Sequence, residues 1–352
     1  MIRKLNTVAM TAAALGSSIA VLATTDAFAC TRVFWNTNAL AKVSGRTMDW
    51  PESTMPKLAV FPRGTARDGG KVGPDVTVKE NAAKWTAKYG SIVTTIYGIG
   101  TVDGLNEHGL GAHLLYLNAT DFGLRDAAKP AIHAGLWAQY ALDNAATVAE
   151  ALALLDKVQI VMAEAHGHKA NVHLALEDAT GDSAIIEYIE GKPVVHHGSE
   201  FRIMTNDPPF DQQLALLGKL DFSKPSSDMT LPGNVNPRDR FQRAAYYSAM
   251  LTEPKNERQA IAQILAIMRN VSVPFGAPYK GFGIYNTEYR TALNLTDKRY
   301  FFELTTSPNV VWADLAKFDL SEGVPAWEID PDNIDLSGDI SAKFQKLDKA
   351  PF

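Results

Sequence analysis

The stretch Ala27-Phe28-Ala29-Cys30-Thr31-Arg32 is the most informative part of this chain. Ala-Phe-Ala is the small-residue pattern at which signal peptidase cuts an exported protein. Cys30 follows it directly and is the only cysteine among the 352 residues. Cleavage after Ala29 would make Cys30 the first residue of the mature protein. One residue would then carry a thiol nucleophile and a free α-amine with a pKa of about 7.7 to 8.0, which can accept a proton near neutral pH.

The residues before Cys30 have the layout of a signal peptide. Arg3 and Lys4 form a short basic region, and residues 8–23 are uncharged and mostly apolar. This stretch is shorter than the roughly 20 apolar residues that a membrane-spanning helix requires, which disfavours a permanent anchor. We therefore predict a signal peptide over residues 1–29 that is removed, and a single domain over residues 30–352 that is periplasmic or secreted.

A second interpretation of Cys30 stays open. Bacterial lipoproteins also begin at a cysteine, which carries a lipid and is acylated on its amine. The protein would then be a lipid-anchored binding protein, tethered through Cys30 and without chemistry of its own. Lipoprotein sites usually have an aliphatic residue three positions before the cysteine and a small residue two before it, whereas this chain has Ala27 and Phe28 there.

The composition is that of an ordinary globular protein, with 46% hydrophobic and 21% charged residues. Removing residues 1–29 takes away two of the 34 basic and one of the 39 acidic residues, which leaves a net charge of −6. A mildly acidic chain without basic runs is not expected to bind nucleic acid, or a membrane after processing. With one cysteine, no intramolecular disulfide can form, so the core alone must hold the fold.

Residue patterns along the mature chain predict an α+β fold. β-Branched and aromatic residues between Gly, Asn and Pro indicate strands. Apolar residues at helical spacing, behind capping residues, indicate helices. The predicted strands are 31–35, 42–48, 57–61, 91–97, 100–102, 110–117, 171–176, 184–189, 193–196, 201–204, 289–294 and 299–305, with a surface loop over 65–79. The predicted helices begin at Pro130 and at Thr147 and cover 211–219, 237–250 and 256–269. This grouping indicates stacked antiparallel sheets covered by helices.

Two charged residues in the second predicted strand are candidate partners of Cys30. They belong to Arg46-Thr47-Met48-Asp49-Trp50. Alternation places Arg46 and Met48 on one face and Asp49 on the other, unless the strand bends at its end. A guanidinium beside the sulfur favours the thiolate, and a carboxylate near the α-amine can orient it. The alternative is a structural ion pair between Arg46 and Asp49.

Further candidates lie in two loops. Asn206 follows a predicted strand, where its amide could donate to a developing oxyanion, a contribution of about 3 kcal/mol; a turn-forming role is the alternative. Arg240 stands on the first turn of a predicted helix and, taken alone, would be a surface arginine. The segment 222–237, rich in Ser, Pro and Gly, is a candidate rim loop.

Three histidines close together in sequence, His166, His168 and His173, raise the question of a zinc site. No carboxylate motif or HExxH spacing accompanies them. We therefore expect solvent-exposed or loop histidines and no metal.

These pieces together resemble the choloylglycine hydrolase family of N-terminal-nucleophile (Ntn) hydrolases, which includes bile salt hydrolases and penicillin V acylases. The order of the motifs along the chain makes the joint match specific, although each is short. The matching motifs are Cys30-Thr31-Arg32, Arg46-Thr47-Met48-Asp49, Asn106-Glu107-His108-Gly109-Leu110, Thr205-Asn206-Asp207-Pro208, and Pro232-Gly233 through Arg240-Phe241.

The resemblance implies a role for each candidate. Cys30 is the implied nucleophile, with Arg46 and Asp49 beside its thiol and amine. Asn206 is the implied side-chain oxyanion donor, and Arg240 orders the charge network of the site.

The resemblance also implies a fold and a reaction. The backbone N–H of Tyr116, seven residues after Gly109, falls where the family has a second oxyanion donor. The implied fold is a four-layer αββα sandwich, and members commonly form homotetramers. The implied reaction is hydrolysis of a linear amide through a thioester, with no metal or cofactor.

The amide that is cleaved stays open at this stage. Members with an export signal resemble the Gram-negative branch, whose penicillin V acylases can also cleave long-chain N-acyl homoserine lactones, a quorum-quenching activity. Bile salt hydrolases are frequently cytoplasmic enzymes of Gram-positive bacteria, so a conjugated bile salt is the alternative substrate. Trp50 and Tyr116 are candidates for the wall of an acyl pocket, and core packing would explain them equally well.

Overall fold

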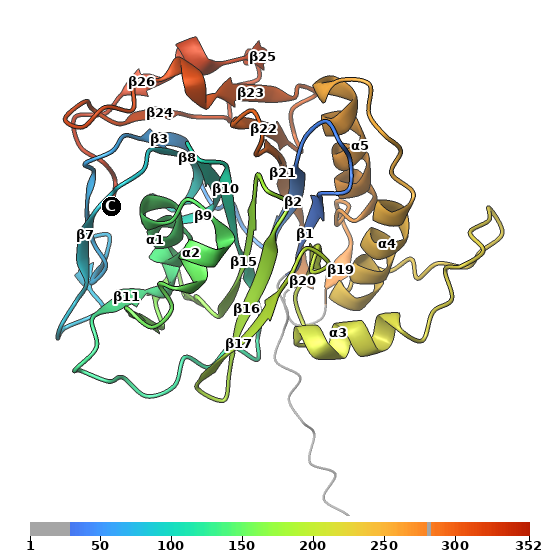
Figure 1. Cartoon of the computed structure of the whole chain (residues 1–352), viewed down its shortest axis with the longest axis horizontal. Helices are drawn as coiled ribbons and strands as arrows, with labels where there is room; N and C mark the ends of the chain where they lie inside the picture. Colours follow the sequence, from blue (N-terminus) through green and yellow to red (C-terminus); the bar gives the residue numbers. More distant parts are fainter. Residues whose placement is uncertain (1–28, 280–282) are drawn as a thin grey trace, which may run out of the picture.

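Two large β-sheets occupy the centre of the molecule, in a computed structural model that describes residues 29–279 and 283–352 (Figure 1). Sheet A has seven strands in the spatial order β18 (Ile203–Met204), β1 (Ala29–Trp35), β2 (Val43–Trp50), β21 (Asn286–Asn294), β22 (Arg299–Leu304), β23 (Val311–Asp314) and β25 (Gly338–Asp339). Sheet B has nine strands in the spatial order β17 (Lys192–His197), β16 (Ser183–Ile189), β15 (Val172–Asp178), β10 (Leu110–Tyr116), β9 (Gly100–Asn106), β8 (Ser91–Ile96), β3 (Leu58–Phe61), β24 (Trp327–Ile329) and β26 (Gln345–Lys346). The predicted signal peptide lies outside the described residues, except for Ala29, and stays a prediction.

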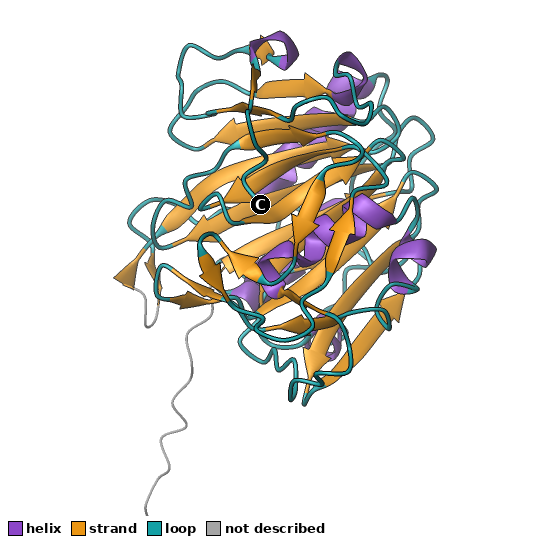
Figure 2. Ribbon diagram, turned by 90° about the vertical axis from the view of Figure 1, so that its left-hand side faces the viewer, coloured by secondary structure: helices purple, strands orange, loops and turns teal. Residues whose placement is uncertain are grey.

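The strand pairing is almost entirely antiparallel. Neighbouring strands are antiparallel throughout sheet B. In sheet A the pair of β23 and β25 is parallel, and the other neighbours are antiparallel. Figure 2 shows that the regular structure of the molecule is mostly strand, with fewer helices. The predicted α+β fold built on two antiparallel sheets is confirmed.

Helices cover the outer face of each sheet, and Figure 1 shows the two groups on opposite sides. In sheet A, α4 (Pro237–Ala249) contacts β1, and α5 (Glu257–Asn270) contacts β2 and β21. In sheet B, α1 (Trp137–Asn144) contacts β9 and β10, and α2 (Val148–Leu152) contacts β15. α3 (Phe210–Leu217) packs on α4.

Three hydrophobic clusters match these layers. The first lies between the sheets and contains Phe34 of β1 and Leu105 of β9. The second joins sheet B to the helix that contains Trp137. The third contains Val33 of β1 and Ile264 of α5. Successive residues of β1 therefore face opposite layers, which explains why this strand is apolar on both faces.

The helix starts follow local capping signals. Asn236 accepts a hydrogen bond at the start of α4, where Pro237 takes the first helical position. Asn256 caps α5, and Thr147 caps α2 as predicted. These short-range signals explain why the predicted helices at 237–250 and 256–269 agree with the structure to within one residue.

The helix predicted to begin at Pro130 is wrong at its start. The chain forms strand β11 (Ala131–His133) instead, and α1 begins only at Trp137. The N–H of Ala131 donates to Asn81 O at 3.0 Å, and its carbonyl accepts from Ala83 N at 2.8 Å. Distant backbone thus provides the hydrogen bonds that a helix would have made locally.

The remaining elements are short. The segment 65–79, predicted as a loop, contains three brief strands. The short elements are β4 (Ala66–Asp68), β5 (Lys71–Val72), β6 (Asp75–Val76), β7 (Lys84–Thr86), β12 (Gln159–Val161), β13 (Glu164–Ala165), β14 (His168–Lys169), β19 (Pro278–Tyr279), β20 (Gly283–Ile284), η1 (Ala134–Leu136), η2 (Leu315–Lys317) and η3 (Ser341–Lys343). Within residues 29–279 and 283–352, no helix has the length and apolar character to cross a bilayer.

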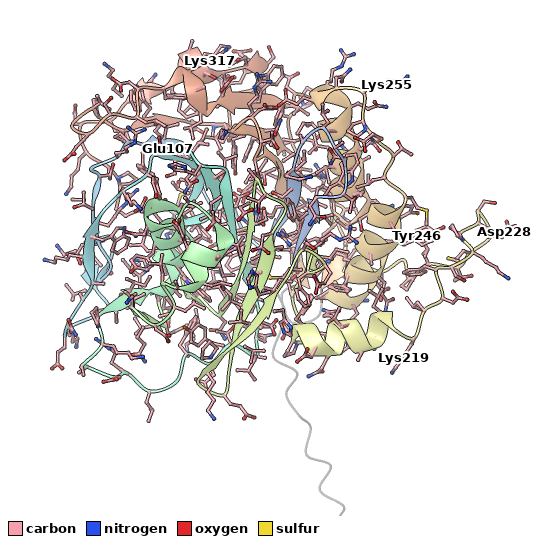
Figure 3. The ribbon with its side chains drawn as sticks, in the orientation of Figure 1. Glu107, Lys219, Asp228, Tyr246, Lys255 and Lys317 are labelled. Atoms are coloured by element: carbon pink, nitrogen blue, oxygen red, sulfur yellow. The ribbon has the colours of Figure 1, made fainter. Side chains whose placement is uncertain are left out.

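The connection between α3 and α4 projects from the body, with Asp228 in its outer part (Figure 3). Phe222 anchors its first part by packing edge-on against Tyr246 of α4, with ring centroids 5.1 Å apart. Arg243 holds its second part through bonds to the carbonyl oxygens of Pro232 and Asn234.

The close packing of α5 on sheet A depends on Gly45 in β2. A Cβ atom at this position would lie 2.4 Å from Ile264 Cγ2 and 2.9 Å from Met268 Cγ. We predict that Gly45→Ala lowers the free energy of unfolding by about 1–3 kcal/mol through overpacking. Urea denaturation measures this change. Gly233→Ala is the matched control, because nothing lies within 4 Å of its added Cβ; equal stability of the two variants would contradict the proposed contact.

Candidate active site

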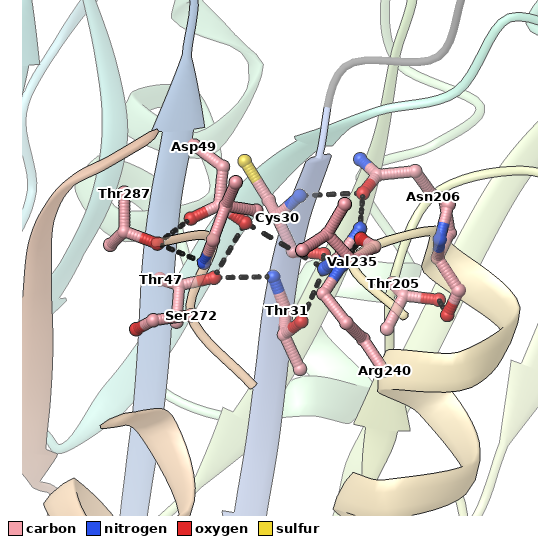
Figure 4. Close-up of polar contacts among 12 residues, drawn as sticks. Cys30, Thr31, Thr47, Asp49, Thr205, Asn206, Val235, Arg240, Ser272 and Thr287 are labelled. Atoms are coloured by element: carbon pink, nitrogen blue, oxygen red, sulfur yellow. Dashed lines mark hydrogen bonds and ion pairs between the residues drawn. The ribbon is translucent and has the colours of Figure 1, made fainter. Parts of the chain in front are cut away.

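Cys30 lies at the start of β1, in the buried space between the two sheets, and is 2% exposed. Its sulfur is 3.7 Å from a guanidinium nitrogen of Arg46 and 3.9 Å from Met48 Sδ. Its backbone nitrogen donates to Asn206 Oδ1 at 2.5 Å. Figure 4 shows the thiol beside β2 and the nitrogen directed towards Asn206. The structure therefore brings together the N-terminal part of β1, strand β2 and the loop after β18.

Arg46 occupies the face of β2 that the alternation predicts. It shares this face with Met48, whose sulfur is 3.1 Å from Arg46 Nη2. The same nitrogen donates to Leu114 O of β10 at 2.9 Å, which links the two sheets behind the thiol. Arg46 Nη1 lies 3.8 Å from Asp103, and the side chain is 1% exposed. The guanidinium is thus fixed beside the sulfur, away from solvent.

Asp49 lies on the Thr47 face of β2, which is the face that alternation predicts, and Thr47 Oγ1 also accepts from Thr31 N at 3.0 Å. The pairing of β2 with β21 shifts register between Met48 and Asp49. The Asp49 carboxylate accepts from Thr47 and Thr287 and lies 3.7 Å from Arg240. The ion pair between Arg46 and Asp49, the alternative raised by the sequence, is therefore wrong.

Arg240 is fully buried, so the interpretation as a surface arginine is wrong. Because α4 packs on β1, the first turn of the helix directs this side chain into the site. Its guanidinium donates to Cys30 O at 2.6 Å, to Thr31 Oγ1, and to Asn206 Oδ1 at 2.8 Å. Its Nε donates to Val235 O at 2.8 Å. One side chain therefore holds three separate segments together.

Asn206 contacts the backbone of Tyr116, the last residue of β10. Asn206 Nδ2 donates to Tyr116 O at 2.7 Å. In an antiparallel strand, the N–H and C=O of one residue point to the same edge. The next residue, Leu117, bonds to Asn171 on the opposite edge, towards β15. The Tyr116 N–H is therefore directed to the same edge of β10 as the Tyr116 carbonyl, which Asn206 contacts.

The electrostatics of the site disfavour a free thiolate. Burial raises the pKa of the Cys30 thiol, because the thiolate would lose its hydration. The Arg46 guanidinium is the strongest opposing influence on this pKa, and the Asp49 carboxylate adds to the increase. Burial also raises the pKa of Asp49, against the nearby charge of Arg240. The thiol is thus neutral at neutral pH and needs a base to remove its proton.

Sequence reasoning missed a chain of buried charges behind Arg46. Asp103 of β9 accepts from Thr291 at 2.6 Å and lies 3.7 Å from His113 Nδ1. His113 Nε2 is 2.6 Å from Glu177, which accepts from Arg32 Nε at 3.0 Å. The only signal was the presence of charged residues inside strands that are otherwise apolar.

Opposite charges stabilise this chain in spite of its burial. Burial acts to raise the pKa of Glu177, but Arg32 and His113 hold it well below its usual range. Burial acts to lower the pKa of His113, but Glu177 and Asp103 raise it overall. The two carboxylates therefore favour the protonated form of the imidazole.

The three histidines near residue 170 have separate surroundings. His166 stacks on Tyr97, with ring centroids 4.0 Å apart. His168 packs edge-on against Trp50. The expectation of an exposed or loop position is wrong for His173, which is buried in β15 and bonds to Glu187 at 3.0 Å and to Thr205 O at 2.8 Å. In the described part of the chain, no three His, Cys, Asp or Glu residues gather as metal ligands would.

A cavity of about 100 Å³ opens beside the thiol. Residues of β2 and Cys30 line one part of it, and β8, β9, β10 and the segments 133–135 and 163–172 line most of the rest. Trp50 and Tyr116, the candidates for the wall of an acyl pocket, both border this cavity, and Trp50 Nε1 donates to Tyr97 OH at 2.8 Å. The candidate rim loop, 222–237, contributes no lining residue to it.

The comparison with known families gives a match that begins at Cys30. The family model described as linear amide C–N hydrolases, choloylglycine hydrolase family, matches residues 30–338. The chain belongs to the choloylglycine hydrolase family. It is therefore a hydrolase of linear amides, which confirms the predicted family and enzyme class.

Individual relatives agree with this assignment. A penicillin V acylase from Pectobacterium atrosepticum is 35% identical over 347 residues, which cover 91% of this chain and 90% of the relative. The structure of a penicillin V acylase from Agrobacterium tumefaciens superposes with a TM-score of 0.81 at 38% identity, over 92% of this chain and 99% of that one. A variant of a conjugated bile acid hydrolase from Clostridium perfringens shares the fold, with a TM-score of 0.73 at 22% identity over 86% of this chain and 97% of that one.

The effect of Arg46 on the thiol can be measured directly, because Cys30 is the only cysteine. We predict that Arg46→Gln moves the pH midpoint of Cys30 alkylation by iodoacetamide to higher pH, since the largest influence favouring the thiolate is lost. Arg46→Lys should restore part of the shift, and Arg238→Gln, at an exposed position, should leave the midpoint unchanged. A midpoint that stays in place or moves to lower pH in Arg46→Gln would contradict this role.

Proposed function

We propose that this protein is an exported acylase of the penicillin V acylase type, activated when residues 1–29 are removed. The observation that carries this proposal is the position of the Cys30 nitrogen, 2.5 Å from Asn206 Oδ1 and on the residue whose sulfur faces Arg46. After cleavage this nitrogen is the free α-amine. The start of the family match at residue 30 supports the same cleavage point.

The contacts of the site support a mechanism with two half-reactions. Cys30 Sγ attacks the amide carbonyl, and the thiol proton passes to the α-amine. Asn206 Nδ2 and the Tyr116 N–H donate to the oxyanion; the bond of Asn206 to Tyr116 uses one of its two amide hydrogens and leaves the other for substrate. The proton then moves from the α-amine to the leaving amine, and a thioester remains.

Water completes the reaction. The α-amine, again unprotonated, takes a proton from water as the water attacks the thioester carbonyl. Collapse of the second oxyanion breaks the C–S bond, and the thiolate recovers the proton. The free acid leaves. Arg240 acts by holding Asn206 and the Cys30 carbonyl in place, so we assign it a positioning role.

We also propose that the layers form the four-layer αββα sandwich of Ntn hydrolases and that the mature protein is periplasmic or secreted. The placement of α4 and α5 outside sheet A, and of α1 and α2 outside sheet B, supports the first point. The signal-peptide pattern before Cys30 supports the second.

For the substrate we propose N-acyl amides with a narrow apolar acyl group, with penicillin V first and long-chain N-acyl homoserine lactones second. Two relatives named penicillin V acylase, each at 35% identity or more, support this choice. So does the cavity of about 100 Å³, because apolar cavities of this order accept a single aromatic ring. The bulky steroid of a conjugated bile salt needs a wider site.

The proposed base predicts that the enzyme is inactive when any residue before Cys30 is retained. A form that retains Ala29 before Cys30 has an amide in place of the α-amine and should release no amine from penicillin V, although it folds. Cys30→Ala in the processed chain should be equally inactive. Turnover by the form that retains Ala29 would show that another group is the base. Intact mass of the mature protein completes the test, because a lipid adduct on Cys30 would identify a tether.

The proposed acyl pocket predicts an order of substrates. Each buried methylene should favour the acyl group by roughly 0.8 kcal/mol until the cavity is full, so long-chain homoserine lactones should exceed short-chain ones. Penicillin V should be cleaved faster than penicillin G, whose acyl group is shorter. The measurement is kcat/KM from release of the free amine, with glycocholate and taurocholate assayed alongside. A tenfold or larger lead for either bile salt would overturn the proposed substrate but leave the Cys30 mechanism intact.

A further inference from the structure

His133 is an unpartnered polar side chain in the wall of the acyl cavity. It is 1% exposed and lines the same cavity as Cys30. Among the residues that the structure describes, neither Nδ1 nor Nε2 of its ring makes a well-formed hydrogen bond, although the backbone of Lys71 lies near enough to favour the protonated ring. Such a buried donor and acceptor is costly unless a ligand or an ordered water satisfies it.

The fold holds His133 against sheet B through two glycines. A Cβ atom on Gly100 of β9 would lie 2.5 Å from Gly135 O, so the turn after His133 rests directly on the backbone of β9. A Cβ atom on Gly135 would lie 3.2 Å from the ring nitrogen Nδ1. The His133 N–H donates to Gly69 O at 2.9 Å. The imidazole is therefore fixed in place rather than free to turn out to solvent.

The chemistry of the ring suits a neutral partner. Burial lowers the pKa of His133 to about 4, although the backbone of Lys71 favours the protonated form. At neutral pH the ring thus offers one N–H donor and one lone pair. Two other polar side chains of the cavity are engaged: Thr101 donates to Gln139 at 2.7 Å, and Tyr97 donates to Glu52 at 2.7 Å.

We propose that His133 is a specificity-determining residue that hydrogen-bonds to an oxygen atom within the acyl group. An acyl chain whose carbonyl lies at Cys30 of sheet A enters a cavity whose wall includes His133, on the turn that packs on β9 of sheet B. The enzyme then prefers acyl groups that carry an ether, keto or hydroxyl oxygen to hydrocarbon groups of the same length. This inference rests on the proposed function, since it requires that the cavity receives the acyl group.

The preference runs against the ordinary effect of an apolar cavity. An ether oxygen that enters such a cavity without a partner loses its hydration, so an oxygen-containing acid should bind more weakly than its hydrocarbon counterpart. Tighter binding of the oxygen-containing acid therefore requires a donor inside the cavity. Arg46 Nε and Nη1 are also unsatisfied, but Arg46 lies beside the thiol on sheet A, where the acyl carbonyl reacts. His133 is therefore the candidate donor on the side of the cavity that sheet B forms.

Calorimetry with free acids tests the proposal. The probes are straight-chain alkanoates of one length in which an ether oxygen replaces each methylene in turn, together with phenoxyacetate and 3-phenylpropanoate. We expect at least one oxygen position to bind the wild-type enzyme about 5- to 10-fold more tightly than the parent alkanoate. His133→Phe should abolish this preference, and His133→Gln, which keeps an N–H donor, should retain part of it. Thermal unfolding of each variant confirms that it is folded.

Two results would overturn the proposal: no oxygen position preferred by the wild-type enzyme, or a preference that persists unchanged in His133→Phe. Binding requires no turnover, so it is judged separately from the proposed function. If the enzyme cleaves no N-acyl amide but keeps a preference that depends on His133, the proposed function fails and the oxygen-binding site stands. If it cleaves penicillin V and the 3-phenylpropanoyl analogue equally well and shows no preference in binding, this inference alone fails.

Discussion

The buried guanidinium of Arg240 is the contact on which the rest of the site depends. It joins the carbonyl of Cys30 at the start of β1, the side chain of Asn206 after β18, and the first turn of α4. A charge without water must be matched by acceptors and an opposite charge, and the Asp49 carboxylate at 3.7 Å provides the latter. Because these partners come from distant segments, the site can form only when sheet A and α4 are already assembled.

A second set of charges fixes the separation of the two sheets behind the thiol. Arg46 of sheet A faces Asp103 of sheet B, and Arg32 of sheet A bonds to Glu177 of sheet B, with His113 between the two carboxylates. Glu177 has a lowered pKa, so its contribution to stability is present above the ordinary carboxyl pKa of about 4.3 and is lost as the pH falls through the folded value. His113 has a raised pKa, so its contribution is full below about 6.5 and is lost as the pH rises through the folded value. The network is therefore most favourable between these limits.

The sequence predicted those helices and strands that are determined by interactions between residues close together in the chain. Asn236 and Asn256 cap their helices with bonds to residues three positions ahead, so the sequence predicted the bounds of these helices to within one residue. The structure of the segment after Pro130 could not be predicted in this way, because its backbone bonds to residues about fifty positions earlier. Of the candidate site, the grouping of Cys30 with Asn206 came from the family resemblance rather than from pattern alone.

The charged residues inside the strands show the same limit. Asp103, His113 and Glu177 interrupt apolar runs, but their sequence positions say nothing of which opposite charge each one meets. Alternation places Asp49 on the Thr47 face of β2, but it does not identify Arg240 of α4 as the opposite charge that Asp49 meets. His173 likewise reads as one of three neighbouring histidines, although its bond to Thr205 O makes it a support of the loop that carries Asn206. Long-range pairing, rather than residue type, decides these roles.

In the proposed mechanism, the burial of Cys30 explains why the enzyme would become active only on cleavage. The sulfur of Cys30 is in contact with Arg46 and Met48, of which one is already a cation and the other has no basic site. The Asp49 carboxylate is near, but Thr47, Thr287 and Arg240 occupy its oxygens, which leaves it poorly placed to receive the thiol proton. In the proposed mechanism the missing base is the nitrogen of Cys30 itself, and as a peptide nitrogen it has no lone pair available for a proton. Removal of residues 1–29 would therefore create the base at the position where Asn206 already holds it.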